Sequence, residues 1–262
     1  MPLTVIHNDQ RHEGPASRFF FVLLGVLGGK SGHCTSHTDF ALSFCYLRFM
    51  AGMPRLCGVI LAAGESSRMG ADKALLPWPP AAPGTPSSGQ TFLSASIESL
   101  NPFSEMVIVV AGKNASVIAP VVFANGAYLV TNPAPDRGQF SSLQVGLHEV
   151  LNHGRDAAVV TLVDRPPVNL ATLQKLCDAF TSAEYGKWAV VPEYRGNHGH
   201  PFLVAREMIE AFLKAAPTAN AREVEHQHQQ HIEYVTVDDP AVTLNVDTPQ
   251  DYAALSSSAS SK

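Results

Sequence analysis

Short apolar runs alternate with longer helix-like segments from residue 56 onward, and this alternation constrains the fold more than any other feature of the sequence. Val107–Val110 and Ala157–Val160 are apolar throughout, which is typical of strands that a parallel sheet buries on both faces. We predict strands at Leu56–Ala62, Met106–Ala111, Ala127–Thr131 and Ala157–Val163. We predict helices at Thr91–Leu100, Asn114–Phe123, Phe140–Leu151 and Asn169–Phe180.

This order favours one α/β domain over residues 53–255, doubly wound and Rossmann-like, with a mainly parallel sheet. Ligands of such sheets bind beyond the carboxyl ends of the strands. We therefore expect the segments that follow the predicted strands to gather at one rim. They are residues 62–73, 112–114, 132–142 and 164–168.

The C-terminal part of the sequence is less regular. Strands are expected at Trp188–Pro192, His231–Val237 and Thr243–Val246. Helices are expected at Arg206–Lys214, Ala221–Gln230 and Thr248–Leu255. The segment 79–90 is rich in proline, glycine and serine and predicts a surface loop inserted in the domain, whereas the low-complexity tail 256–262 predicts disorder.

Composition narrows the class of protein. The 262 residues are 45% hydrophobic, which suits a globular α/β domain, and the net charge of −5 gives no reason to expect a nucleic-acid partner. The four cysteines lack the short spacing of a zinc site or a disulfide framework, so we expect reduced thiols and a cytoplasmic protein. No apolar run reaches the ~18 residues that a membrane span requires.

Residues 1–52 show little strand or helix periodicity. We expect them to form a disordered extension outside the fold, or to precede the true start at Met53. The apolar run 19–27 follows Arg18 and has the length of a signal peptide, but no typical small-residue cleavage site comes after it. A signal or anchor therefore stays open as the less favoured alternative.

The segment 58–77 reads GVILAAGESSRMGADKALLP and joins a predicted strand to a loop of small residues. Gly64 and Gly70 are six residues apart and Lys73 follows three residues later, so neither the dinucleotide fingerprint nor the P-loop pattern is matched. Glycines let the backbone approach a ligand, and free N–H groups with the cations Arg68 and Lys73 suit a polyphosphate. From these residues alone, a plain strand-to-helix turn with exposed charges is equally open.

The same segment resembles the signature loop of nucleotidyltransferases that activate phosphorylated small molecules, above all the molybdenum cofactor cytidylyltransferases and guanylyltransferases. The similarity lies in Leu61-Ala62-Ala63-Gly64, Ser66, Arg68-Met69-Gly70, Lys73 and Leu75-Leu76-Pro77. It implies a fold like that of the nucleotide-diphospho-sugar transferases, with Arg68 and Lys73 as catalytic cations on a triphosphate. The implied nucleotide contacts are Leu61, Ala62, Ala63, Gly64, Arg68, Gly70 and Lys73.

Two aspartates, Asp164 and Asp247, each follow a predicted strand. Taken alone, either could cap the helix that comes next. Asp164-Arg165-Pro166 resembles the family's Asp-x-Pro motif, and Asp247 occupies the second acidic position of a similar family segment. The resemblance implies that Asp164 is catalytic and that both carboxylates bind Mg²⁺, which prefers hard oxygen ligands. Arg165 departs from the family's commoner Met or Gln and would contact substrate phosphate.

Three further segments carry candidate binding residues. Gly138–Leu147 resembles a family helix start, which implies that Ser142 lies near the base or ribose; an ordinary first-turn serine is the alternative. Gly196–Pro201 resembles the family's Gly-x-x-Gly-His-Pro loop, which implies that Gly199, His200 and Pro201 face the acceptor. The histidines in 226–231 could bind a metal, but a solvated helix face is favoured.

The resemblance implies transfer of a nucleoside monophosphate from an NTP to a phosphorylated acceptor, with Mg²⁺ as cofactor and pyrophosphate released. CTP and molybdopterin are the favoured substrates, because the Leu61-Ala62-Ala63-Gly64 form is more like the cytidylyltransferases. A molybdenum enzyme or its maturation chaperone would receive the product; no membrane or nucleic-acid partner is expected. GTP, a sugar or polyol phosphate acceptor, and a non-catalytic nucleotide-binding protein remain as alternatives.

Overall fold

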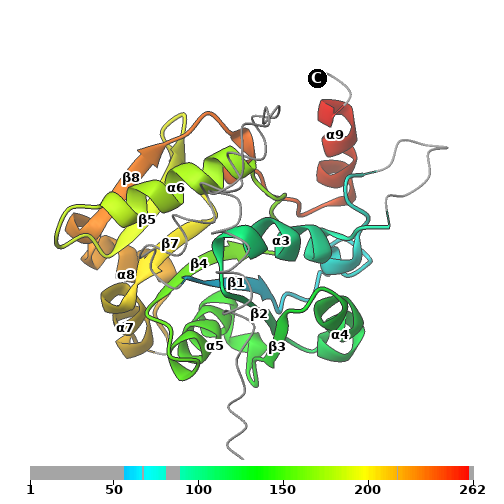
Figure 1. Ribbon diagram of the computed structural model, residues 1–262. Helices are drawn as coiled ribbons and strands as arrows, with labels where there is room; N and C mark the ends of the chain where they lie inside the picture. The colour runs from blue at the N-terminus through cyan, green and yellow to red at the C-terminus, as the bar shows by residue number, and fades with distance from the viewer. Residues whose placement is uncertain (1–55, 67, 81–88, 217, 260–262) are drawn as a thin grey trace, which may run out of the picture. The chain divides into compact units, whose positions relative to one another are not determined.

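An eight-stranded sheet forms the centre of the computed structural model, which describes residues 56–66, 68–80, 89–216 and 218–259. The strands lie in the order β3-β2-β1-β4-β7-β5-β6, and β8 pairs with β5 outside this path (Figure 1). Their bounds are β1 Leu56–Ala62, β2 Met106–Ala111, β3 Tyr128–Thr131, β4 Ala157–Leu162, β5 Ala189–Tyr194, β6 Asn197–His198, β7 Phe202–Ala205 and β8 Ile232–Thr236. The predicted α/β fold is confirmed.

The first four strands form a parallel block. β1 pairs with β2 on one side and with β4 on the other, and β2 pairs with β3, each in parallel orientation. The predicted strands in this part of the chain are confirmed to within a residue or two. Because the strands are parallel, their carboxyl ends meet at one edge of the sheet, where the loops after β1, β2, β3 and β4 begin.

The second half of the sheet contains antiparallel strands that the sequence analysis missed. β7 runs antiparallel to both β4 and β5, and the two-residue strand β6 pairs antiparallel with β5. β8 is parallel to β5. The predicted strand at Thr243–Val246 is wrong, because these residues form a turn and an irregular segment after the 3₁₀ helix Pro240–Val242. Instead of a strand ladder, the Val246 amide donates to the Asp164 carbonyl over 2.9 Å.

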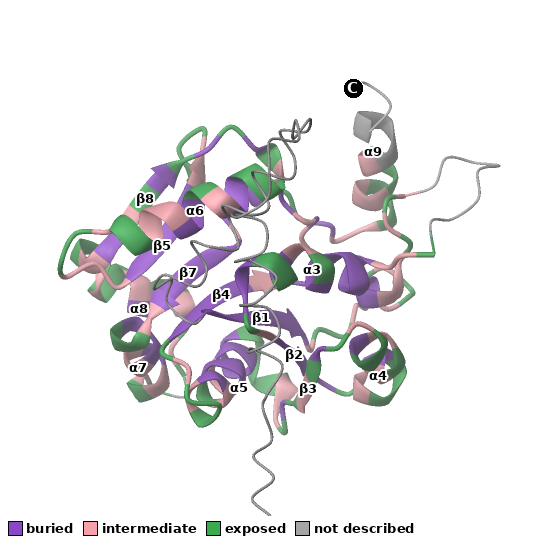
Figure 2. Cartoon of the chain, viewed as in Figure 1, coloured by how far each residue is buried: buried purple, intermediate pink, exposed green. Residues whose placement is uncertain are grey.

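Helices cover both faces of the sheet, as predicted for a doubly wound fold. α3, α4 and α6 contribute to one hydrophobic core, and α5, α7 and α8 contribute to the other (Figures 1 and 2). Their bounds are α3 Phe92–Leu100, α4 Ala115–Ala124, α5 Gln139–Asn152, α6 Leu170–Ser182, α7 Arg206–Lys214, α8 Ala221–Gln227 and α9 Pro249–Ala259. α8 ends earlier than predicted, and α9 continues past Leu255 into residues for which disorder was expected.

Successive side chains of β1 point to opposite faces of the sheet, so this strand contributes to both hydrophobic cores. Leu56 and Ile60 pack on one side, and Cys57 and Val59 pack on the other. Gly146 brings α5 close to this sheet, because a Cβ added there would lie 2.7 Å from Val59 Cγ1. The first turn of α5 is thereby held beside the carboxyl ends of the parallel strands.

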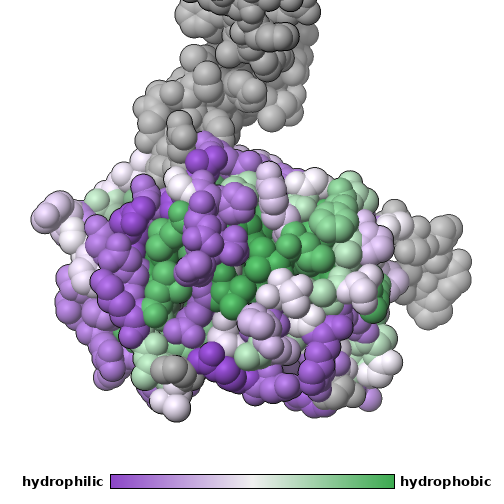
Figure 3. Space-filling model, turned by 90° about the horizontal axis from the view of Figure 1, so that it is seen from below, coloured by the Kyte–Doolittle hydropathy of each residue, from purple (hydrophilic) through white to green (hydrophobic). Residues whose placement is uncertain are grey.

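The surface carries both hydrophobic and hydrophilic areas. On the face shown in Figure 3, hydrophobic residues form a central band between hydrophilic ones. Within the described part of the chain, no helix combines the length and the apolar character that crossing a bilayer demands. The predictions for residues 1–52, for most of the 79–90 loop and for residues 260–262 lie outside the described residues.

Candidate active site at the carboxyl ends of the parallel strands

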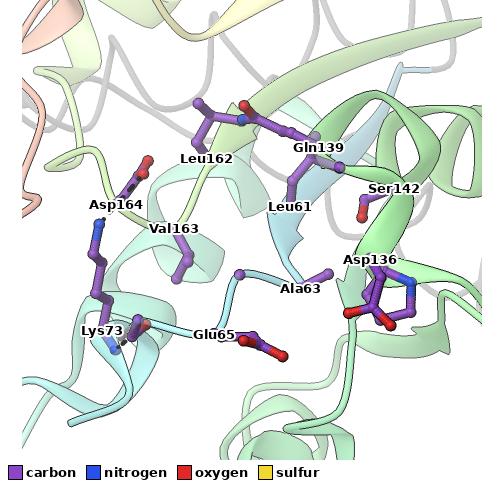
Figure 4. A pocket seen from close by; sticks show the side chains of 14 residues that line it. Leu61, Ala63, Glu65, Lys73, Asp136, Gln139, Ser142, Leu162, Val163 and Asp164 are labelled. Atoms are coloured by element: carbon purple, nitrogen blue, oxygen red, sulfur yellow. Dashed lines mark hydrogen bonds and ion pairs between the residues drawn. The ribbon is translucent and has the colours of Figure 1, made fainter. Parts of the chain in front are cut away.

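A cavity of about 390 Å³ opens where β1 and β4 end and α5 begins (Figure 4). Its walls come from the loop after β1, the segment before α5 and the end of β4. The lining residues are Leu61, Ala63, Gly64, Glu65, Ser66, Lys73, Pro135, Asp136, Gly138, Gln139, Ser142, Leu162, Val163 and Asp164. The expected rim therefore contains a real cavity.

Side chains hold the loop after β1 in place. The Ser66 hydroxyl accepts a hydrogen bond from the Lys73 amide (3.1 Å), and Ser66 adopts a left-handed φ of 50°. Asp72 caps the short helix that starts at Lys73, and Asn114 donates to Asp72 Oδ2 (2.7 Å) and to the Ala62 carbonyl (3.0 Å). Lys73 thus begins a turn whose backbone is fixed from both sides.

Lys73 connects the two aspartates that were predicted to bind metal. Its Nζ lies 2.7 Å from Asp247 Oδ1 and 3.7 Å from Asp164 Oδ2, and Figure 4 shows it extended toward Asp164. Arg68 Nη2 lies 3.1 Å from Asp247 Oδ1. The fold therefore gathers Arg68, Lys73, Asp164 and Asp247 into one cluster, and their roles stay a prediction.

The two carboxylates lie in different environments. Burial raises the pKa of Asp164, and the charge of Lys73 opposes this effect. Its Oδ1 is buried without a hydrogen-bond partner. At Asp247, the hydrogen bond from Lys73 lowers the pKa of the carboxyl. Two carboxylates on one ammonium, one with an unpaired buried oxygen, form a donor set that fits a hard divalent cation.

The candidate metal site contains two carboxylates, those of Asp164 and Asp247. No group of three or more His, Cys, Asp or Glu side chains in the described ranges is arranged to hold an ion. Sites with one or two carboxylates are typical of Mg²⁺ bound together with substrate phosphates and water.

Not every residue predicted to bind the nucleotide or the metal lines the cavity. Leu61, Ala63, Gly64, Lys73, Ser142 and Asp164 do so. Ala62 is buried at the end of β1, and Arg68, Gly70 and Asp247 lie outside the lining. Arg68 and Asp247 are nevertheless joined to this site through the ion pairs around Lys73.

Asn132 organises the α5 side of the cavity, although it was not among the predicted site residues. It is buried, and its Nδ2 donates to Ser141 Oγ (2.8 Å) and Ser142 Oγ (3.0 Å). Gly138, with φ of 90°, makes the turn into α5. The Asn-Pro pair directly after a predicted strand was the signal for this role, since asparagine favours such strand-to-helix turns.

An ion-pair bridge between two loops at the cavity was also missed. Lys113 Nζ lies 2.7 Å from Glu65 Oε1 and 2.9 Å from Asp136 Oδ1, and both carboxylates belong to lining residues. Hydrogen bonds from Lys113 to Glu65, and then to Asp136, raise the lysine pKa. The three side chains are exposed and lie far apart in the sequence. No local pattern of charges therefore predicted this contact.

The predicted acceptor residues lie around a second cavity. Gly199 and His200 line it, whereas Pro201 lines a small neighbouring cavity beside Pro166. His200 has a buried, unpartnered Nδ1, and burial, followed by the charge of Arg165, lowers the pKa of its ring to about 3. His200 is therefore neutral at physiological pH and supplies no positive charge to an acceptor.

A parallel block with a strand-end cavity, a loop carrying two cations and two carboxylates paired with the same lysine is typical of a nucleotidyltransferase-type α/β protein. The model of the family described as the MobA-like NTP transferase domain matches residues 58–232, and the chain belongs to this family. The resemblance stated from the sequence is thus confirmed.

Individual relatives support this assignment. The chain is 34% identical over 130 residues to a probable molybdenum cofactor guanylyltransferase of Rhodopirellula baltica, a match that spans 50% of this chain and 58% of that protein. It is 25% identical over 202 residues to the molybdenum cofactor cytidylyltransferase of Escherichia coli, over 74% of this chain and 92% of that one. Rv0371c from Mycobacterium tuberculosis has a similar crystal structure, with a TM-score of 0.64, 28% identity and coverage of 78% and 98%.

Proposed function

We propose that the protein transfers a nucleoside monophosphate from an NTP to the phosphate of a molybdopterin-type acceptor and releases pyrophosphate. The observation that carries this proposal is the position of Lys73, between Asp164 and Asp247 and beside the strand-end cavity. Arg68 joins the same cluster. A non-catalytic nucleotide-binding protein would have no need of all four charged groups.

In the proposed reaction, an acceptor phosphate oxygen forms a bond to the α-phosphorus of the NTP. The bond from this phosphorus to the bridging oxygen breaks, and pyrophosphate leaves with the electron pair. The nucleophile is already anionic, so no general base is needed. Lys73 and Arg68 would neutralise charge on the triphosphate, and their placement before binding is the main catalytic contribution.

Asp164 and Asp247 are the proposed ligands of Mg²⁺, which supplies charge neutralisation at the α-phosphate when bound. The unpaired buried Oδ1 of Asp164 supports this fit. A crystal structure of Rv0371c described as a complex with manganese has 26% identity to this chain and a TM-score of 0.60. Mg²⁺ would compete with the Lys73 ammonium for the carboxylate oxygens, and the triphosphate would compete with the carboxylates for the ammonium, so either would displace Lys73 from one carboxylate.

CTP is the proposed nucleotide and molybdopterin the proposed acceptor. The Leu61-Ala62-Ala63-Gly64 form favours CTP, whereas the relatives are named for both CTP and GTP chemistry. We propose a cytoplasmic location, which the buried free thiols of Cys57 and Cys177 support. A molybdenum enzyme or its maturation chaperone would accept the product.

Thermal unfolding of the full chain with CTP, GTP, ATP or UTP, each with and without Mg²⁺, tests the proposal. A ligand at a hundred times its Kd adds about 2.7 kcal/mol to the free energy of unfolding, which corresponds to several degrees. We expect a Mg²⁺-dependent shift with CTP. A shift with GTP in place of CTP would identify GTP as the nucleotide substrate. The absence of a shift with every nucleotide would contradict the proposed activity.

A further inference from the structure

Asp239 is a buried acid that the proposed reaction does not use. The residue is only 3% exposed, and it lies between β8 and the 3₁₀ helix Pro240–Val242. The sequence analysis attached no function to it. A buried carboxylate is costly unless hydrogen-bond donors surround it, so its partners indicate what the side chain does.

The partners of Asp239 belong to two separate segments of the chain. Its Oδ2 accepts hydrogen bonds from the Asn169 amide (2.9 Å) and the Thr172 hydroxyl (2.9 Å), and its Oδ1 accepts one from the Ala241 amide (3.0 Å). Asn169 is the N-cap of α6, and its own side chain makes no capping bond. One carboxylate therefore caps both α6 and the 3₁₀ helix, although it lies 70 positions from Asn169.

The two segments that Asp239 joins carry the two proposed metal ligands. Asp164 begins the segment that leads from β4 to α6, and Asp247 ends the segment that leads from Asp239 to α9. At the far end of the contact, the Val246 amide donates to the Asp164 carbonyl over 2.9 Å. The segments are thus fastened together at Asp239 and again directly beside both ligands.

Packing between these two points leaves little freedom for the segment after Asp239. Val242 is fully buried in one hydrophobic core, and Arg165 Nη1 donates to the Leu244 carbonyl (3.1 Å). Because packed interiors transmit a displacement instead of absorbing it, a shift at Asp239 is expected to reach Asp247.

We propose that Asp239 is a positioning residue, which fixes Asp247 relative to Asp164 and Lys73. The inference rests on the proposed roles of these three residues and adds the group that sets their separation. Mg²⁺ demands nearly ideal octahedral geometry, so a small displacement of one carboxylate lowers its affinity for the site. A purely structural role of Asp239 would instead lower the unfolding temperature and leave the site unchanged.

Mn²⁺ titration of the full chain, followed by electron paramagnetic resonance, tests the inference. Asp239→Asn keeps one acceptor oxygen and replaces the other by an N–H donor, so at least one partner loses its acceptor. Loss of hydrogen bonds that orient metal ligands weakens binding by ~10–100-fold, and we expect about tenfold here, at a temperature at which circular dichroism shows a folded variant. Asp238→Asn makes the same change at the exposed neighbouring residue and should bind Mn²⁺ like wild type.

A double variant separates positioning from stability. Asp239 acts through Asp247 in this proposal, so Asp239→Asn should cause little further loss of Mn²⁺ affinity when Asp247→Asn is already present. Additive losses would mean that Asp239 does not act through Asp247, and would overturn the inference. If Asp239→Asn does not fold, Thr172→Val removes one donor to the carboxylate and should weaken Mn²⁺ binding in the same direction.

Acetylation of Lys73 by an N-hydroxysuccinimide ester, measured by peptide mass spectrometry, gives a readout without metal. The Lys73 side chain is 11% exposed and paired with Asp247 in wild type. Its acetylation should become several-fold faster in Asp239→Asn, relative to the exposed Lys214 in the same sample. An unchanged acetylation rate in the folded variant would overturn the inference.

The combined results distinguish this inference from the proposed function. If Asp164→Asn weakens Mn²⁺ binding and folded Asp239→Asn does not, the metal ligands are retained and the positioning role is overturned. If wild type binds no Mn²⁺, the proposed metal ligands are contradicted, and the acetylation of Lys73 then decides whether Asp239 positions Asp247.

Discussion

Lys73 Nζ lies 2.7 Å from Asp247 Oδ1, although 174 positions separate the two residues in the chain. The lysine side chain is only 11% exposed, so this contact is shielded from solvent more than the ordinary surface pairs of the molecule. In the proposed mechanism, phosphate would compete for this nearly buried ammonium, and a metal ion would compete for the two carboxylates that share it.

Replacement of Lys73 by alanine should reduce pyrophosphate release by ~10²–10³, because a preorganised charge at the reaction centre typically contributes about 3–4 kcal/mol to lowering the barrier. Assays with CTP or GTP and acceptor at saturating concentrations measure this effect. Lys214→Ala is the control, since Lys214 is exposed and pairs with Glu210 one helical turn away. Near-normal turnover of Lys73→Ala would show that the reaction does not require Lys73.

Replacement of Asp164 by asparagine should weaken Mn²⁺ binding at least tenfold, because a neutral amide is a poorer ligand than a carboxylate. Titration followed by electron paramagnetic resonance measures it. Since burial disfavours the charged form of Asp164, the variant should unfold at the same temperature as wild type or a higher one. Asp156→Asn alters an exposed acid paired with Arg206 and should leave metal binding unchanged. Equal Mn²⁺ affinity in Asp164→Asn would exclude Asp164 as a ligand.

Replacement of Gly146 by alanine should destabilise the fold. The added Cβ would lie 2.7 Å from Val59 Cγ1 and 2.9 Å from Val110 Cγ2, both on stiff, buried side chains. Overpacking of this kind costs ~1–3 kcal/mol, which exceeds the gain of about 1 kcal/mol from helix propensity. Calorimetry should show a lower unfolding temperature. Gly64→Ala meets nothing within 4 Å and should not change it; an unshifted Gly146→Ala would show that α5 can move.

Acidification should destabilise the protein through His200. Burial lowers the pKa of the folded-state ring from 6.5 to about 3, so between these values the unfolded chain binds one more proton than the folded chain. The free energy of unfolding therefore falls as pH decreases from 6.5 toward 3, by up to about 1.4 kcal/mol per pH unit from this group. Urea unfolding of wild type and His200→Phe between pH 7 and 4 should show the shallower slope for the variant. Identical slopes would mean that the ring is solvated.

Much of the parallel block was predictable from local pattern. Runs such as Val107–Val110 are apolar because both faces of their strands are covered, and this is visible in the sequence without knowledge of the covering helix. The loop after β1 was placed at the ligand-binding edge because parallel strands direct their carboxyl ends to the same side. The antiparallel strands β6 and β7 are short, with two and four residues, and carry too little periodicity to be identified.

The sequence by itself determined the order of the main strands and helices, the candidate cations and carboxylates, and the family, because these depend on local periodicity and on motif spacing. Only the tertiary structure decided that Lys73 contacts both aspartates, that Asp164 and Arg165 face different cavities, and that His198 stacks on Tyr234. The reason is physical. Burial of one face produces a periodic pattern of apolar residues within a segment, and this pattern can be read locally. Which distant residue a side chain contacts depends on how the strands pair, and the sequence of one segment does not contain that information.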